Sequence, residues 1–179
     1  MQDFSAHIMD IAQNSVRANA RCIEINIEKH LLHDTYVITV IDDGCGMDTE
    51  TLLKVADPFF TSRIVRKVGL GIPLLKQNAE ATGGSVEIIS TEGKGTTIRA
   101  IFAYSHIDCP PCGNIPNTIV LLATANPDIE VVFKYKTDNG EYVFNSFEVK
   151  EILYGVPLYN TEIIQAIQKM ISDNIDEID

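Results

Sequence analysis

Hydrophobic and polar positions repeat with two different periods in the first part of this chain, and each period predicts a kind of element. Residues 3–19 carry apolar side chains at helical spacing on one face and polar ones on another, which predicts a helix. Apolar and polar residues alternate over 23–28, and the segment 36–41 is β-rich and mostly apolar. Both segments are therefore predicted to be strands.

The same two periods continue as far as residue 103. Short helices are expected over 48–56 and 72–82, and a hairpin of two strands over 86–91 and 96–103. The stretch 59–68 has no clear period, which indicates a loop.

The pattern changes beyond Tyr104. Cys109-Pro110-Pro111-Cys112-Gly113 predicts a rigid linker. After it the pattern predicts a helix over 117–125, strands over 130–136 and 141–145, and two helices, the last over 161–175. We therefore expect a first domain over 1–103, and over 104–179 a small acidic α/β subdomain that serves as an interaction region.

Charge is unevenly distributed between these two parts. The 179 residues carry a net charge of −11, which argues against nucleic acid or an anionic membrane as the main partner. Residues 1–103 hold 10 Lys+Arg and 13 Asp+Glu, whereas residues 104–179 hold 4 and 12. No apolar run reaches the ~20 residues of a membrane helix, and the N-terminus has no signal-peptide core. Four scattered cysteines form no disulfide framework, so a cytoplasmic location is expected.

The segment Asp42–Gly46 combines a carboxylate with glycines at the end of a predicted buried strand. A carboxylate there can accept a hydrogen bond from an exocyclic amine such as that of adenine, and glycine lets the backbone approach a flat base. The alternative is an ordinary strand-to-helix turn, in which Asp and Gly are common.

Asp10 and Asn14 lie one helical turn apart and share a polar face. The Asn14 oxygen is a suitable ligand for Mg²⁺, and an acid one turn away can deprotonate water or a hydroxyl. The alternative is a solvated helix face. His7 lies on the same side, where a structural role is expected.

Gly69-Leu70-Gly71 precedes a predicted helix, whose free N–H groups and dipole favour an anion. Four basic residues and no acid lie between Asp57 and Glu80, which favours phosphate over a plain loop. The pattern is neither a Walker A sequence nor the dinucleotide fingerprint.

Three further motifs have simpler alternatives. Phe59-Phe60 is more typical of a core than of a cofactor contact. Gly93–Thr97 suits a plain hairpin, unless Thr97 points back toward the Asp42 end of the sheet. Cys109 and Cys112 are half of a zinc site, and no second pair accompanies them, so a metal or redox role is not expected.

Together and in this order, these motifs over residues 3–103 resemble the GHKL superfamily of gyrase-type topoisomerases, heat-shock chaperone ATPases, histidine kinases and MutL-type ATPases. The sequence of the segment 58–71 most resembles the histidine-kinase branch. The resemblance implies an α+β fold, a two-layer α/β sandwich with a mixed, mostly antiparallel sheet and helices on one face. It also implies ATP and Mg²⁺ as cofactors, and a lid over residues 57–71.

The resemblance implies site residues one by one. Asn14 would coordinate Mg²⁺, Asp42 would bind the adenine amine, and Asp10 would act as the catalytic base. Many histidine kinases carry Asn at the position of Asp10, whereas the hydrolysing branches carry an acid, usually Glu. The other implied contacts to the base are Gly44, Gly46 and Met47, with Thr97 acting through a water molecule. The implied contacts to the phosphates are Arg17, Gly69, Leu70 and Gly71, with Arg63 at the terminal phosphate. Phe60 is the implied contact from the lid.

Only about nine residues precede the motif at Asp10, too few for a helical hairpin with a phospho-acceptor histidine. We therefore expect a histidine-kinase-like protein that transfers phosphate from Mg-ATP to a separate, unidentified protein, with a homodimer as a further option. The alternatives are an ATP-hydrolysing conformational switch and a non-enzymatic ATP sensor.

Overall fold

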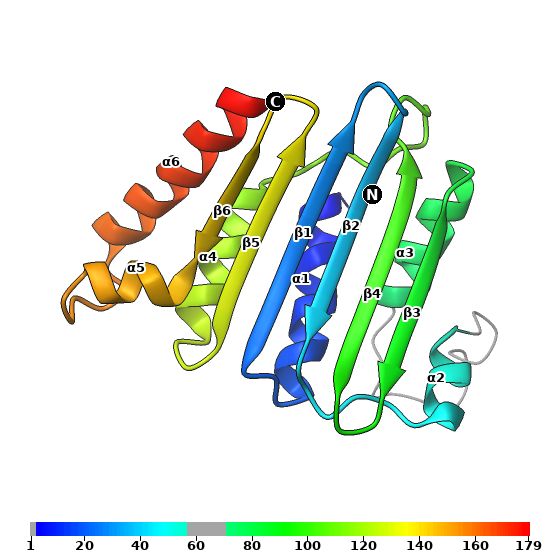
Figure 1. Ribbon diagram of the computed structural model, residues 1–179, viewed down its shortest axis with the longest axis horizontal. Helices are drawn as coiled ribbons and strands as arrows, with labels where there is room; N and C mark the ends of the chain where they lie inside the picture. Colours follow the sequence, from blue (N-terminus) through cyan, green and yellow to red (C-terminus); the bar gives the residue numbers. More distant parts are fainter. Residues whose placement is uncertain (1–2, 57–70) are drawn as a thin grey trace.

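A computed structural model describes residues 3–56 and 71–179 (Figure 1). In this part of the chain, six strands form one sheet in the order β3-β4-β2-β1-β5-β6. In chain order the elements are α1 (Phe4–Arg17), β1 (Cys22–His30), β2 (Thr35–Asp42), α2 (Thr49–Ala56), α3 (Gly71–Ala81), β3 (Ser85–Thr91), β4 (Gly95–Ala103), α4 (Ile115–Ala125), β5 (Glu130–Thr137), β6 (Glu141–Asn145), α5 (Ser146–Ile152) and α6 (Thr161–Ile178).

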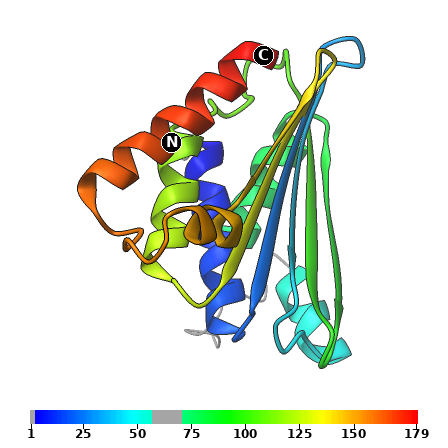
Figure 2. The ribbon, with the colours of Figure 1, turned by 60° about the vertical axis from the view of Figure 1, so that its left-hand side comes forward.

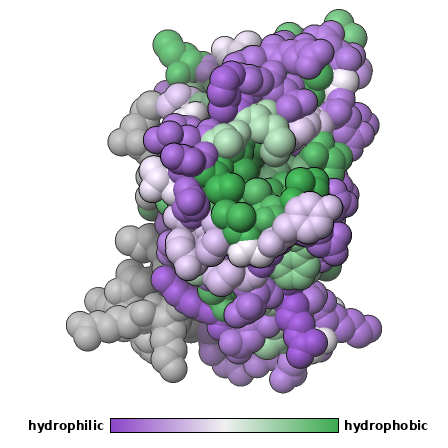
Figure 3. All heavy atoms as spheres, turned by 90° about the vertical axis from the view of Figure 1, so that its left-hand side faces the viewer, coloured by the Kyte–Doolittle hydropathy of each residue, from purple (hydrophilic) through white to green (hydrophobic). Residues whose placement is uncertain are grey.

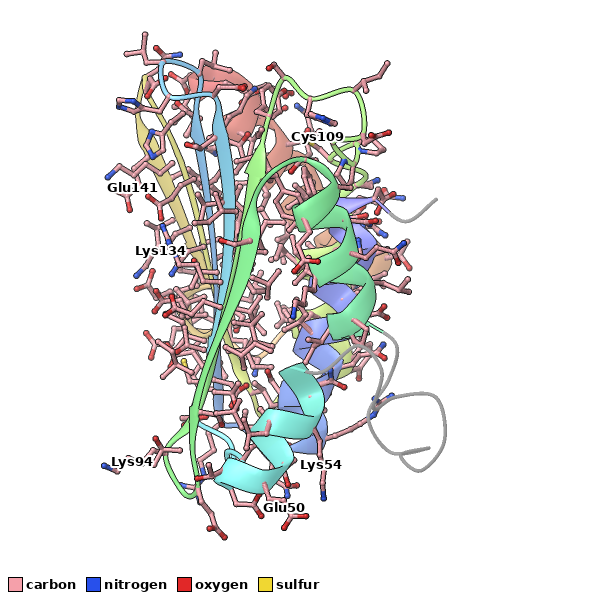
Figure 4. All side chains as sticks on the ribbon, turned by 90° about the vertical axis from the view of Figure 1, so that its right-hand side faces the viewer. Glu50, Lys54, Lys94, Cys109, Lys134 and Glu141 are labelled. Atoms are coloured by element: carbon pink, nitrogen blue, oxygen red, sulfur yellow. The ribbon has the colours of Figure 1, made fainter. Side chains whose placement is uncertain are left out.

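The helices lie on one side of the sheet, as Figures 2 and 4 show from two directions. The strand pairs are antiparallel except β1 and β5, which are parallel. The predicted two-layer α+β sandwich with a mixed, mostly antiparallel sheet is therefore confirmed.

Strands β5 and β6 extend the sheet built by the first part of the chain. Cys22 to Lys29 of β1 pair with Glu130 to Thr137 of β5, so residues 104–179 share the sheet with residues 1–103. The functional division at residue 103 stays a prediction.

Apolar side chains of α1 and α4 pack between the helices and the sheet. Phe4 is fully buried and stacks on Tyr36 of β2 with ring centroids 4.5 Å apart. Alternate residues of β1, including Ile23 and Ile25, are buried, whereas the residues between them face the other side. That open face is polar: Lys134 points away from the helices and donates a 2.9 Å hydrogen bond to Glu24 (Figure 4).

Helix ends are set by local caps. Asp48 accepts a 2.6 Å hydrogen bond from the Thr51 N–H and so caps the start of α2. Helix α4 begins two residues before the predicted start, because Asn114 caps it by accepting from the Asn117 N–H at 3.0 Å. Helix α6 extends to Ile178, and the carboxylate of Asp179 just beyond it accepts from Lys29 at 2.7 Å.

Candidate functional site

A cavity of about 240 Å³ lies between α1, α2, the start of α3, the end of β2 and the start of β4. Most of its apolar wall comes from Ile11, Val55, Ile72 and Ile98, and polar groups are gathered where β2 ends. The other lining residues are Asn14, Ser15, Arg17, Ala18, Asp42, Cys45, Gly46, Met47, Thr51 and Thr96. An apolar slot with a few polar groups at one end is typical of a small-molecule site.

Asp42 is half-buried at the end of β2, and two donors fix its carboxylate. The Ser15 hydroxyl donates to Oδ2 at 2.6 Å, and the Gly44 N–H donates to Oδ1 at 2.9 Å. An ionised carboxylate has about four lone-pair sites, so each oxygen can still accept a hydrogen bond from a ligand. The cavity therefore presents an oriented acceptor for a ligand N–H group.

Sequence reasoning missed Ser15. It is 2% exposed, and its partner Asp42 is 27 residues away along the chain. The available signal was its position directly after Asn14, on the side of α1 that faces the sheet.

Gly44 and Gly46 are required by the packing of their own loop. A Cβ at Gly46, where φ is 64°, would lie 2.0 Å from the Thr91 carbonyl oxygen. A Cβ at Gly44 would lie 2.8 Å from the Cβ of Ala18. Gly46 lines the cavity and Gly44 does not, although the Gly44 N–H holds Asp42.

The neighbouring Asp43 has a different role from Asp42. Its Oδ1 accepts from the N–H groups of Cys22 at 2.9 Å and Arg21 at 2.7 Å, where β1 begins. The hydrogen bond from the Cys22 N–H is the main cause that lowers the pKa of the Asp43 carboxyl; burial opposes it, and the hydrogen bond from Arg21 lowers the pKa further.

The structure corrects the position of the threonine at the site. Side chains alternate along β4, and Thr96 lies opposite Asp42 whereas Thr97 lies opposite Ile41. Thr96 lines the cavity and Thr97 does not, because Thr97 faces the open side of the sheet. The Thr96 hydroxyl contacts Ser90 Oγ at 2.9 Å, and the same Ser90 oxygen accepts from the Met47 N–H at 2.9 Å.

Asn14 and Arg17 are neighbours on the cavity wall. Arg17 Nη1 donates to Asn14 Oδ1 at 3.2 Å, in a contact exposed to solvent. Asp10, one turn earlier on α1, is half-buried and does not line the cavity. Gly71 packs against it, since a Cβ at Gly71 would lie 2.8 Å from the Cβ of Asp10. Helix α3 therefore begins in contact with the predicted catalytic residue.

His7, about one turn before Asp10 on α1, also contacts α3. Its Nε2 lies 2.8 Å from Nδ2 of Asn78 on α3, and its buried Nδ1 has no hydrogen-bond partner among the residues that the structure describes. Burial lowers the pKa of the imidazole, and the charges of Asp10 and Asp3 oppose this only in part. The neutral form is thus favoured, which suits the expected structural role.

Cys109 and Cys112 are free thiols in the loop that covers the start of α1 (Figure 4). The carbonyls of Pro111 and Cys112 accept from the N–H groups of Phe4 and Ser5 at 2.9 and 3.1 Å. Burial raises the pKa of both thiols. Within residues 3–56 and 71–179, no three His, Cys, Asp or Glu side chains gather as a metal site would require.

Four predicted site residues, Phe60, Arg63, Gly69 and Leu70, lie outside the described residues, as does most of the predicted lid. In the described segments, no helix has both the length and the apolar character needed to cross a membrane.

Two relatives found by sequence are sensor proteins, and both are far longer than the matching region. A putative sensor protein of Shewanella frigidimarina is 39% identical over 85 residues, which are 47% of this chain and 13% of that protein. Sensor histidine kinase WalK of Bacillus subtilis is 36% identical over 87 residues, 46% of this chain and 14% of WalK. This chain therefore corresponds to a small fraction of these relatives.

Two solved structures share the fold at low sequence identity. The N-terminal domain of a DNA repair protein aligns with a TM-score of 0.55 and 17% identity, over 80% of this chain and 52% of that one. The MutL ATPase domain of Aquifex aeolicus, complexed with ADP, aligns with a TM-score of 0.52 and 16% identity, over 86% of this chain and 70% of that one.

Residues 4–106 match the family model described as histidine kinase-, DNA gyrase B-, and HSP90-like ATPase. This match covers more than half of the chain, and the sequence relatives fall in the histidine-kinase branch. The chain thus belongs to the GHKL superfamily of histidine kinase-, gyrase- and HSP90-like ATPases, in its histidine-kinase branch.

Proposed function

We propose that the chain binds Mg-ATP in the cavity beside Asp42 and transfers the terminal phosphoryl group to a separate protein. The observation that supports this best is the Asp42 carboxylate, held by Ser15 and Gly44 as an acceptor in a cavity with an apolar wall. The adenine amine supplies the matching donor, and the apolar wall suits the flat ring. The family membership supports ATP as the nucleotide.

Asn14 and Arg17 are proposed to bind the phosphate end. Asn14 presents an amide oxygen on the cavity wall, which is the ligand type that Mg²⁺ prefers, and it lies beside a guanidinium that can pair with phosphate. Mg²⁺ bound there would neutralise charge on the phosphate oxygens. Gly71 at the start of α3, and Phe60, Arg63, Gly69 and Leu70 outside the described residues, are proposed nucleotide contacts on the family resemblance alone.

In the transfer step, a nucleophilic side chain of the acceptor protein forms a bond to the terminal phosphorus while the bond to the bridging oxygen breaks and ADP leaves. Asp10 is proposed to accept the proton that the nucleophile loses. The position of Asp10 against the first residue of α3 supports this role, because a helix N-terminus favours the phosphate groups.

The same contact supports a second candidate, an ATP-hydrolysing switch in which Asp10 activates water instead. Phosphate release from Mg-ATP by the purified chain and by Asp10→Asn separates the two. Turnover that disappears in the variant favours the switch, and phosphate on an added acceptor protein without free phosphate favours the kinase. ATP binding with neither product favours a nucleotide sensor, and absence of ATP binding in titration calorimetry overturns the proposal as a whole.

A further inference from the structure

Helices α5 and α6 lie at the edge of the sheet away from the cavity (Figure 1), and exposed apolar side chains lie on them and on the connection between them. Ile152 is 72% exposed and Val156 46% exposed. We call this surface the α5–α6 face; its other exposed large apolar side chains are Phe147, Tyr154, Tyr159 and Met170. Such a concentration on one face marks an interaction site in many proteins.

The α5–α6 face continues inward into partly buried apolar residues. Val149, Leu153, Ile163 and Ile164 are only partly covered, and they pack against the core beneath them. Figure 3 shows this side of the molecule, where apolar atoms line a hollow and polar atoms surround it. A hollow with an apolar centre and a polar rim has the composition of a protein–protein interface.

The charge around this face is strongly negative. Residues 146–178, which form α5, α6 and their connection, contain six Asp+Glu and two Lys, with no Arg, so this segment has a net charge of −4. Both lysines have partners within the chain: Lys169 pairs with Asp173 at 2.6 Å, and Lys150 donates to the Pro127 carbonyl. Glu148, Glu151 and Glu162 are exposed on α5 and α6 themselves.

We propose that the α5–α6 face docks a basic amphipathic helix of a partner protein. The apolar stripe of such a helix would lie in the hollow, and its flanking Lys and Arg would face the exposed carboxylates. A second copy of this chain fits less well, because it would bring two segments of net −4 together. The proposal goes beyond the ATP site and does not depend on phosphoryl transfer.

Two synthetic peptides test this proposal with the full chain and without nucleotide. Each has about 18 residues, or five helical turns, with Leu at helical spacing, and the polar face is Lys in one and Glu in the other. We expect fluorescence anisotropy to show saturable binding of the Lys peptide, weakened by added salt, and none of the Glu peptide.

Ile152→Ser with Val156→Ser should raise the Kd of the Lys peptide at least about tenfold. The matched control is Leu31→Ser with Leu32→Ser, two exposed leucines at the turn between β1 and β2, which should leave the Kd unchanged. Unchanged ATP affinity and circular dichroism would show that both variants are folded. Asp42→Asn should also leave peptide binding intact, so failure of the ATP proposal is separable from failure of this one.

Four outcomes overturn the proposal. Equal binding of the two peptides, or an unchanged Kd in the Ile152/Val156 variant, excludes recognition by the α5–α6 face. A dimer in sedimentation equilibrium that this variant dissociates assigns the face to a second copy. Binding to phosphatidylserine vesicles that the same variant abolishes assigns it to a membrane.

Discussion

The hydroxyl of Ser15 donates a 2.6 Å hydrogen bond to Oδ2 of Asp42, which joins the middle of α1 to the end of β2 at the cavity wall. One short contact thereby orients the carboxylate and ties the helix that carries Asn14 to the strand that carries Asp42. The proposed base-binding and phosphate-binding groups are held in one arrangement before any ligand arrives, which reduces the entropy lost on binding.

Ser15→Ala should weaken both the fold and the site. The buried hydroxyl donates to a charged group, and loss of such a bond costs roughly 1.5–3 kcal/mol. We expect a decrease of this order in the free energy of unfolding measured by urea denaturation. Affinity for ATP should fall less than in Asp42→Asn, because the Gly44 N–H still holds the carboxylate. Unchanged stability and affinity would show that the contact is not maintained in solution.

Asp42→Asn should weaken ATP binding by roughly 2 kcal/mol or more, because a charge-assisted hydrogen bond to the base is lost. Asp43→Asn is the matched control. The Asp43 side chain accepts hydrogen bonds from the N–H groups of Arg21 and Cys22 where β1 begins, and an Asn oxygen can still accept both. Titration calorimetry should therefore show a loss at position 42 and little change at 43. Equal affinities in the two variants would remove the adenine assignment.

Thr96→Val and Thr97→Val form a pair that tests which threonine serves the site. Both changes keep a β-branched side chain in the strand, so strand preference is preserved. Thr96→Val removes the contact to Ser90, which binds the Met47 N–H, and should reduce ATP affinity about fivefold, equivalent to one neutral hydrogen bond. Thr97→Val on the open face should have no effect. A larger loss at 97 than at 96 would contradict the register of β4.

His7 should make stability depend on pH. Its pKa is lowered in the folded protein, so the unfolded chain binds more protons in the window between the lowered value and the ordinary value near 6.5. The contribution of His7 is therefore present above about pH 6.5 and is lost as the pH falls through the folded pKa, by at most about 1.4 kcal/mol per pH unit.

His7→Gln keeps a polar partner for Asn78 but removes this titration. Urea denaturation between about pH 7 and pH 5 should show a smaller loss of unfolding free energy in the variant than in the wild type. His106→Asn, at a partly exposed position, serves as the control. Identical pH profiles of His7→Gln and wild type would contradict the burial of a neutral imidazole.

Periodicity predicted the elements well because one face of each helix and strand is buried. Alternation of side chains along a strand could also have identified Thr96 as the site threonine. Ile98, Ala100 and Phe102 of β4 are buried, and Thr96 lies on the same side of the strand. The glycine-threonine motif drew attention to Thr97 instead, because a motif does not state which way a side chain points.

Contacts between distant segments could not be predicted from the pattern. Alternation shows that β5 is a strand but does not identify β1 as its neighbour, and the proline-rich segment before α4 suggested a separate unit. The Ser15–Asp42 hydrogen bond depends on how α1 crosses the sheet, and that geometry follows from packing of the whole core.

The parallel pairing of β1 with β5 has a consequence for how the molecule responds to its surroundings. β1 is hydrogen-bonded to β2 on one side and to β5 on the other, so unfolding of either half exposes an edge of β1, and opening of the two halves is coupled. A ligand that stabilises the end of β2 therefore lowers the population of open forms throughout the sheet, including β5 and β6. Occupancy of the cavity would in this way lengthen the lifetime of a surface at the opposite edge of the sheet without any change in its shape.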